Sequence, residues 1–305
     1  MIKKSRFIRK FEEVGIKDVG EVGGKNASLG EMIQTLKPKG VKIPEGFVVT
    51  ATAYRYFLKQ SGLEKLIKDT LKDLNTKNLT NLAKRGKIIR EAIKKAEFPA
   101  DLKRDIIKAY QNLEKKYGKN TDTAVRSSAT AEDLPGASFA GEHETFLNIR
   151  GAEEVLSASR AAMASLFTNR AISYRVDKGF DHFKVALSVG VQKMVRSDLG
   201  CSGVMFTLDT ESGFKDLVLI NGSWGLGEMI VQGEVTPDEF LVFKKTSKII
   251  DKKLGVKDKK MIYSSGHGIK NTKIISTSQK EKETFTLKED EIIKLAKWGT
   301  LIEEH

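Results

Sequence analysis

The sequence contains a single cysteine, Cys201, and only four histidines among its 305 residues. One cysteine cannot form an internal disulfide, and no cysteines and histidines recur at the spacing of a zinc site. No apolar run approaches the ~20 residues that a membrane-spanning helix needs. The opening residues, MIKKSRFIRKFEE, lack the apolar core and cleavage site of a secretory signal. These absences argue against a disulfide scaffold and a zinc module, and they predict a cytoplasmic protein with no membrane partner.

The composition is typical of a globular protein, with 40% hydrophobic and 30% charged residues, and the length favours about two domains. The net charge is +13. The positive excess lies in two lysine-rich segments, residues 59–119 and 244–294. Their charges are mostly spaced as on solvent-facing surfaces, without the interleaved aromatic residues of nucleic-acid modules. We therefore expect no nucleic-acid partner, and an acidic partner is the alternative to a merely solvated surface.

Apolar periodicity predicts a mixture of helices and strands. Leu29, Met32, Ile33 and Leu36 repeat at helical spacing, whereas residues 185–191 alternate as in a strand. Because strict strand–helix–strand alternation is missing, the predicted fold class is α+β. We expect helices over 61–117 (with a break at Phe98-Pro99), 152–175 and 287–304, a helix capped by Thr50, and strands over 47–49, 123–127, 144–149, 185–191, 201–208, 217–221, 240–244, 249–252, 261–263 and 274–275.

A glycine-rich segment, GEVGGKNAS at residues 20–28, leads into the first helix. Free N–H groups at a helix start and the charge of Lys25 suit a phosphate group. The segment is not a Walker A motif, because Val19 stands where the first glycine belongs and Asn26 follows the lysine. A glycine turn followed by a surface lysine is the alternative interpretation.

The stretch richest in chemistry is VRSSATAEDLPGASFAG, from Val125 to Gly141. It places Arg126 at a strand end, ahead of hydroxyls, two carboxylates and small residues. An arginine fork can bind two phosphate oxygens, and residues 129–140 suit a loop that closes over a triphosphate. An arginine held by salt bridges beside an ordinary surface loop fits the same residues.

Gln192 closes the alternating strand just before a polar turn, Arg196-Ser197-Asp198. Backbone N–H and C=O groups left free at a strand edge can form hydrogen bonds with the edge of an adenine base. A plain strand end is the alternative interpretation. The four histidines have no carboxylate or nucleophile at a catalytic spacing, so we expect surface or structural roles for them.

Five blocks of the sequence resemble the N-terminal region of the phosphoenolpyruvate synthase (pyruvate, water dikinase) family. They are GEVGGKNASLGEM, IPEGFVVTATAYRYFL, VRSSATAEDLPGASFAGEHETFLNIRG, VQKMVRSDLGCSGVMFT and INGSWGLGEMIVQGEVTPDEFLVF. They follow the family's order from about residue 11 to residue 305. The Glu-Asp and Ser-Phe-Ala-Gly pieces after Arg126 favour this family over the related pyruvate, phosphate dikinases.

The resemblance implies an ATP-grasp fold, with a lobe over residues 1–195 that carries a lysine-rich helical insertion (59–119), and a second lobe over 196–305. It implies ATP and Mg²⁺ as cofactors. By motif, Lys25 would contact the nucleotide, Arg126 the phosphates, and Gln192 would lie beside the adenine pocket. Gly141 and Thr145 would belong to the loop and strand that cover the phosphates. Glu228 and Asp238 lie in matching blocks without an assigned role.

The family chemistry has three steps, and this sequence would hold only the first. ATP transfers its terminal pyrophosphoryl group to a histidine, water removes one phosphate, and the phosphohistidine then phosphorylates pyruvate. The sequence stops before the family's Asp-Ile-Glu-Trp and Gln-Ala-Arg-Pro pieces, the phosphohistidine domain and the pyruvate-binding domain. We expect a fragment of a longer enzyme that binds pyruvate only through the missing domains, and a homo-oligomer is the expectation for the full-length enzyme. The alternatives are the nucleotide-binding domain of a related phosphotransferase, either a pyruvate, phosphate dikinase or an antibiotic phosphotransferase, and a stand-alone ATP-binding module.

Overall fold

The computed structural model describes residues 5–130, 144–264 and 271–305. These residues divide into two compact units. Unit 1 comprises the described residues up to Met194, and unit 2 comprises those from Val195 onward. Both units combine helices with β-sheet, so the α+β class is confirmed. Their assignment to two ATP-grasp lobes stays a prediction.

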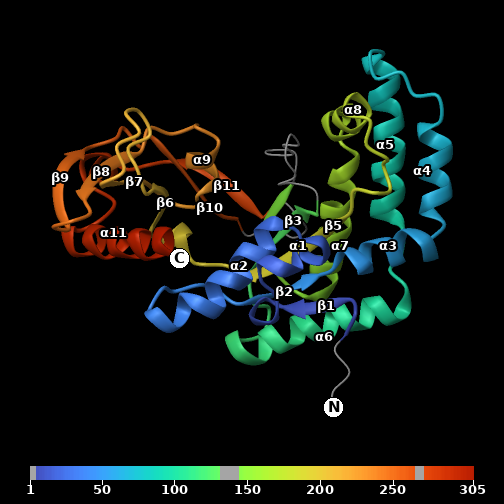
Figure 1. The fold of residues 1–305 in the computed structure, drawn as a ribbon, viewed down its shortest axis with the longest axis horizontal. Helices are drawn as coiled ribbons and strands as arrows, with labels where there is room; N and C mark the ends of the chain where they lie inside the picture. The colour runs from blue at the N-terminus through green and yellow to red at the C-terminus, as the bar shows by residue number, and fades with distance from the viewer. Residues whose placement is uncertain (1–4, 131–143, 265–270) are drawn as a thin grey trace. The chain divides into compact units, whose positions relative to one another are not determined.

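Unit 1 is built on a five-stranded sheet with the order β1-β2-β5-β3-β4 (Figure 1). Every neighbouring pair in it is antiparallel. The central strand, β5, therefore has hydrogen-bonded neighbours on both sides. The strands are β1 (Ile8–Lys10), β2 (Gly46–Val49), β3 (Thr123–Ala129), β4 (Thr145–Ile149) and β5 (Leu187–Lys193).

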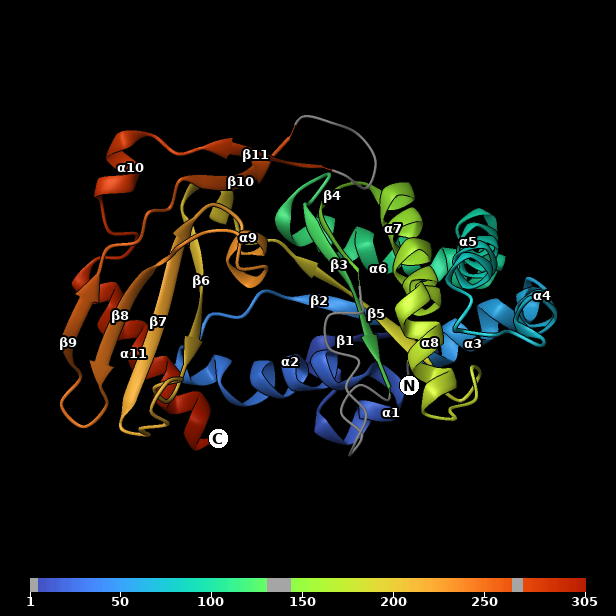
Figure 2. The same ribbon diagram turned by 90° about the horizontal axis from the view of Figure 1, so that it is seen from above.

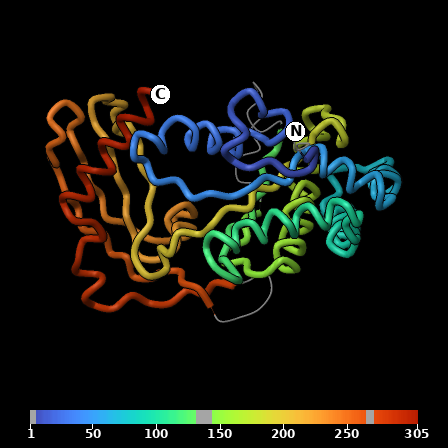
Figure 3. The backbone as a smooth tube through the Cα atoms, turned by 90° about the horizontal axis from the view of Figure 1, so that it is seen from below, coloured from blue at the N-terminus to red at the C-terminus, as the bar shows by residue number. Residues whose placement is uncertain are grey.

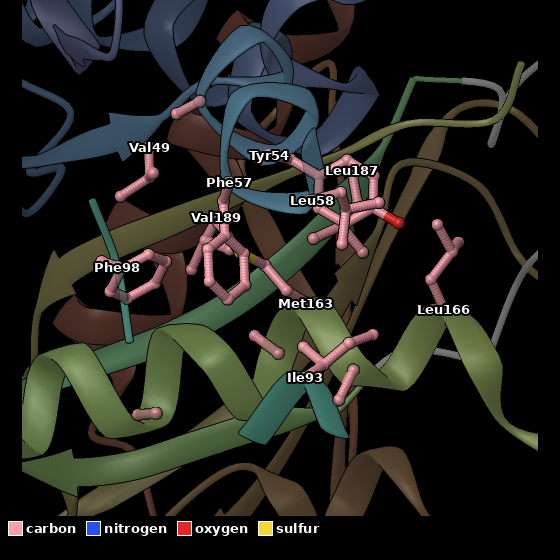
Figure 4. Close-up of a cluster of buried hydrophobic side chains, with 14 of the residues drawn as sticks. Val49, Tyr54, Phe57, Leu58, Ile93, Phe98, Met163, Leu166, Leu187 and Val189 are labelled. Carbon is pink, nitrogen blue, oxygen red and sulfur yellow. The ribbon is translucent and has the colours of Figure 1, made fainter. Parts of the chain in front are cut away.

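Helices pack on both faces of this sheet. The helix α7 lies against β3, β4 and β5 and beside α5, and α2 contacts β3. The main core of unit 1 fills the space under α7, where side chains such as Val49, Phe57, Ile93, Met163 and Val189 meet (Figure 4). The helices are α1 (Val19–Val22), α2 (Gly24–Thr35), α3 (Ala51–Gln60), α4 (Leu63–Leu71), α5 (Leu79–Lys95), α6 (Ala100–Tyr117), α7 (Ala152–Ala164) and α8 (Asn169–Asp177).

Local signals explain several helix boundaries. Thr50 caps α3, as predicted, by accepting a hydrogen bond from the Ala53 N–H at 3.2 Å. The break predicted at Phe98-Pro99 separates α5 from α6. The single helix predicted over 152–175 is wrong, because Thr168 has an extended backbone and caps the new helix α8. A second unpredicted break precedes α5, whose first turn Asn78 caps.

Unit 2 is built on a four-stranded antiparallel sheet with the order β6-β7-β8-β9. The last helix, α11, lies along one face of this sheet (Figures 2 and 3). Its Ile292 and Ala296 pack with Val218, Ile220 and Phe240 of the sheet. The elements are β6 (Cys201–Phe206), β7 (Leu217–Trp224), α9 (Glu228–Val231), β8 (Asp238–Phe243), β9 (Lys248–Lys253), the β10 (Lys259–Tyr263) and β11 (Thr272–Ser276) ribbon, α10 (Gln279–Glu283) and α11 (Glu289–Glu304).

The predicted strands are all present, with ends displaced by up to three residues. The first strand, β1, was not predicted, because its three residues, Ile-Arg-Lys, include a single apolar side chain and give no strand signal. Among the described residues, no helix is long and apolar enough to cross a membrane.

Candidate functional site

On its two central strands, β3 and β5, the sheet of unit 1 has one apolar face and one polar face. In β5, Leu187, Val189 and Val191 belong to the main core under α7. The alternate residues Ser188, Gly190 and Gln192 are on the opposite face, because successive strand side chains alternate. On β3 this opposite face carries Arg126 and Ser128, since they pair with Gly190 and Ser188 of β5. The polar face therefore collects the candidate residues from two neighbouring strands.

Arg126 is the exposed residue of an otherwise buried strand. Its Nη2 donates a hydrogen bond to the Gln192 Oε1 atom at 2.7 Å. Desolvation by the surrounding chain lowers the pKa of the Arg126 guanidinium from its ordinary value. The group still stays protonated at neutral pH, because an arginine pKa lies far above 7. Arg126 thus presents a permanent positive charge on the polar face.

Gln192 is buried, and both ends of its amide have partners. Its Oε1 accepts from Arg126, and its Nε2 donates to the Pro44 carbonyl oxygen at 2.9 Å. The sequence-based premise of a free strand edge is wrong for this residue. β5 pairs with both β2 and β3, where Gln192 is opposite Gly46 and Ala124.

Thr145 lies directly across from Arg126 in the β3–β4 pairing and is exposed. Directly opposite residues share a face, with Cβ atoms about 5 Å apart. The structure therefore brings Thr145 and Arg126 together. Gly141, the other residue assigned to the covering loop, lies outside the described residues, as does most of the predicted 129–140 loop.

Lys25 occupies the first turn of α2 and is exposed, within a buried run from Val22 to Ala27. The turn before it depends on Gly23, whose φ of 73° lies in the left-handed region. A Cβ at Gly23 would also overlap the Oγ and the carbonyl of Ser128 on β3. The glycine therefore lets the start of α2 approach the polar face closely.

Asn26 fixes this approach. Its Nδ2 donates to the Val22 carbonyl at 3.1 Å and to the Ser188 Oγ at 3.0 Å. The single O–H of Ser188 in turn points to the Val22 carbonyl, and the Ser128 carbonyl oxygen lies 3.2 Å from the same Oγ. A Cβ at Gly190 would overlap the Asn26 side-chain oxygen. Sequence reasoning missed Asn26, Ser188 and Gly190, although the small and polar residues between the apolar ones of β5 indicate a face that is not core.

Together these groups suit an anionic ligand. Lys25, Arg126 and Thr145 are all exposed residues. The first two supply positive charge, and Thr145 supplies a hydroxyl. The first N–H groups of α2 add donors that its own helix does not use. Over the described ranges, no group of three histidine, cysteine or acidic side chains could hold a metal ion.

The histidines that the structure describes fit the predicted structural or surface roles. His182 Nδ1 accepts a hydrogen bond from Nε of the buried Arg175 at 3.0 Å. Burial and the Arg175 charge lower the pKa of His182 to about 4, so its imidazole is neutral at pH 7. His143 and His267 lie outside the described residues.

Asp238 has a structural role in unit 2. It forms a fully buried ion pair with Lys257, and its Oδ2 accepts hydrogen bonds from the Thr286 N–H and hydroxyl at 2.8 and 2.9 Å. Lys257 belongs to the lysine-rich segment 244–294, so the prediction of a solvent-facing segment is wrong at this position. Glu228 accepts a hydrogen bond from Gln232 one turn later, at 3.0 Å.

Comparison with known families identifies the chain. Residues 19–305 match the family described as "Pyruvate phosphate dikinase, AMP/ATP-binding domain". The chain belongs to this family.

Curated relatives in this family are phosphoenolpyruvate synthases. The Aquifex aeolicus protein is 57% identical over 99% of the chain, the Synechocystis protein 52% over 99%, and the Escherichia coli protein 49% over 97%. The chain covers 36% of the Aquifex protein and 38% of the other two. It therefore corresponds to little more than a third of these relatives' length, in agreement with the resemblance found in the sequence.

Proposed function

We propose that this chain is the ATP-binding part of a phosphoenolpyruvate synthase. In the complete reaction, ATP, pyruvate and water give AMP, phosphoenolpyruvate and phosphate. The observation that carries the proposal is the exposed Arg126 on the polar face of the central sheet, with Thr145 opposite it. Family membership and the relatives' names support the same reaction. We further propose the ATP-grasp fold, with the two units as its lobes, and a cytoplasmic location.

Arg126 and Lys25 would bind the triphosphate. A guanidinium has five N–H donors in a planar fork, so it can hold two phosphate oxygens at once. Lys25 would add a point charge beside the free N–H groups of α2. Charge that develops on the transferred group would then meet donors already in place, which is the main way proteins accelerate phosphoryl transfer. Thr145 and Gly141 would complete the part of the site that binds the phosphates.

Mg²⁺ normally accompanies ATP and neutralises phosphate charge. The described residues offer no acidic cluster for it, so no step is assigned to protein ligands of the metal. The acceptor histidine and the pyruvate site would lie in parts of the enzyme outside this chain. We therefore expect the chain alone to form no AMP in response to pyruvate.

An ATP titration followed by amide NMR tests the proposed site, because it detects even millimolar binding. Addition of Mg-ATP should shift amides at the start of α2 and in β3 and β5. Arg126→Ala should weaken binding at least tenfold, since hydrogen bonds to charged groups contribute about 1.5–3 kcal/mol. Arg126→Lys should restore little of it, because the planar fork is lost.

Arg104→Ala is the matched control. Arg104 lies on α6 with its side chain 73% exposed, and its loss should leave ATP affinity unchanged. Equal ATP affinity of Arg126→Ala and the unmodified chain would refute the proposed site. An enzyme of the relatives' full length that used an antibiotic in place of pyruvate would refute the proposed reaction but not the site.

A further inference from the structure

The side-chain amide of Gln192 can adopt only one orientation in its surroundings. Its oxygen faces the Arg126 Nη2 at 2.7 Å, and its nitrogen faces the Pro44 carbonyl oxygen at 2.9 Å. A flipped amide would bring NH₂ against a guanidinium, which only donates, and oxygen against a carbonyl, which only accepts. Gln192 is only 7% exposed, so the amide has little freedom to turn elsewhere.

We propose that Gln192 is a positioning residue that orients the Arg126 guanidinium toward the phosphates of the nucleotide. This inference rests on the proposed function. It differs from the sequence-based assignment, in which Gln192 lies at the adenine base. An amide that is buried and held at both ends within the protein exposes little surface with which to contact a base.

The pairing register between β5 and β3 explains why Gln192 is the residue that contacts Arg126. The residue directly opposite Arg126 on β5 is Gly190, which has no side chain. Gln192 is the diagonal neighbour on the same face, within reach of a long side chain. Gly190 itself must be small, because the Asn26 side chain occupies the space above it. On this face of β5, Gly190 leaves room for Asn26 at the start of α2, and the next residue, Gln192, contacts Arg126.

A neutral acceptor suits this task better than an acidic one. A carboxylate at position 192 would hold the guanidinium but cancel the charge that attracts phosphate. The glutamine uses one of the five N–H donors of Arg126 and leaves its positive charge intact. The remaining donors are then available to two phosphate oxygens.

The test compares Gln192→Met with Gln34→Met in the full chain. Gln34 Nε2 also donates to a backbone carbonyl, that of Val14, at 2.6 Å, so the control loses the same kind of bond away from Arg126. ATP and adenosine are titrated separately. Gln192→Met should weaken ATP binding about tenfold and leave adenosine binding unchanged, whereas Gln34→Met should change neither. Equal losses for ATP and adenosine would establish a base contact and overturn the proposal.

A double-mutant cycle with Arg126→Met separates positioning from a general structural role. In the Arg126→Met background, Gln192→Met should cost less than a further twofold in ATP affinity, because the residue it positions is gone. Additive losses would overturn the proposal. Gln192→Glu should weaken ATP binding at least as much as Gln192→Met, although it retains an acceptor for Arg126.

Guanidinium NMR of the nucleotide-free chain gives a readout that needs no ATP. Rotation about the Arg126 Nε–Cζ bond should be slow in the unmodified chain and in Gln34→Met, and fast in Gln192→Met. Fast rotation in the unmodified chain would overturn the proposal. Slow rotation combined with unchanged ATP affinity of Arg126→Ala would instead refute the proposed phosphate site and leave the Gln192–Arg126 contact standing.

Discussion

Replacement of Lys257 by methionine should destabilise unit 2 selectively. The ammonium group of Lys257 is fully buried and bonds to Asp238, to the Gly255 carbonyl at 2.9 Å and to the Lys282 carbonyl at 3.5 Å. Methionine fills a similar volume but cannot donate a hydrogen bond. The substitution therefore leaves the Asp238 carboxylate buried without its counter-charge.

The expected loss is about 3 kcal/mol of unfolding free energy. Removing one partner of a buried ion pair typically costs about 3–5 kcal/mol. Asp238 would keep three other donors, the Gly255 N–H at 2.8 Å and the Thr286 N–H and hydroxyl at 2.8 and 2.9 Å. Because these neutral donors still solvate the carboxylate, the lower end of that range applies.

Urea unfolding followed by tryptophan fluorescence measures this loss in the intact chain. Both tryptophans of the sequence, Trp224 and Trp298, lie in unit 2, so the signal reports on that unit. Lys253→Met is the matched control, since Lys253 contacts Glu239 at 3.6 Å with its side chain 71% exposed. Its loss should cost less than about 1 kcal/mol, as for other surface pairs.

The double variant Asp238→Asn/Lys257→Met decides whether the uncompensated charge is the cause. It should be more stable than Lys257→Met alone, with a coupling energy of at least about 1 kcal/mol in the full cycle. If Lys257→Met unfolded at the same urea concentration as Lys253→Met, or if the double variant showed no coupling, the reasoning from buried charge would be refuted.

Two further predictions concern unit 1. The Lys116 and Lys37 ammonium groups lie 2.6 and 2.7 Å from the Glu45 carboxylate oxygens and lower the pKa of Glu45 from 4.5 to about 2. The ion pairs therefore stabilise the fold above about pH 4.5, and this stabilisation is lost as the pH falls toward 2. Urea midpoints of the unmodified chain and Glu45→Gln should differ at pH 6 and converge by pH 2, and a constant difference would contradict this. Gly23→Ala should lower the melting temperature and weaken ATP binding together, because the left-handed backbone is strained for alanine and its Cβ would overlap Ser128; an unchanged melting curve would contradict the close approach.

Sequence patterns predicted the helices and strands far better than they predicted which of these elements lie next to one another. The alternation in 185–191 identified β5 itself, because strand periodicity is a local property. Its place between β2 and β3 is not local, and this is why Gln192 was expected at a free edge. The chain separates Arg126 from Gln192 by 66 residues, so their contact depends on a register that neither segment encodes alone.

Two errors have different physical origins. Thr168 is an ordinary N-cap residue, but Leu166 and Phe167 continue the apolar pattern across the break and conceal it. Lys257 resembles every other lysine of its segment, and only the folded structure shows that an aspartate and two carbonyl oxygens surround it. Burial of a charge is decided by tertiary partners, which composition does not reveal.

The order of the first sheet has a consequence for how the chain folds during synthesis. β1 pairs with β2, and β3 pairs with β4, yet the strand that joins these two pairs is the last to be made. Until Leu187–Lys193 emerges, β2 and β3 each have an open edge of unpaired backbone groups, which favours pairing with other chains. The nascent protein therefore carries the β1–β2 half-sheet from Val49 onward and the β3–β4 half-sheet from Ile149 onward, and insertion of β5 joins both at once. Such long-range closure slows folding, and the unpaired strand edges favour aggregation until β5 is in place.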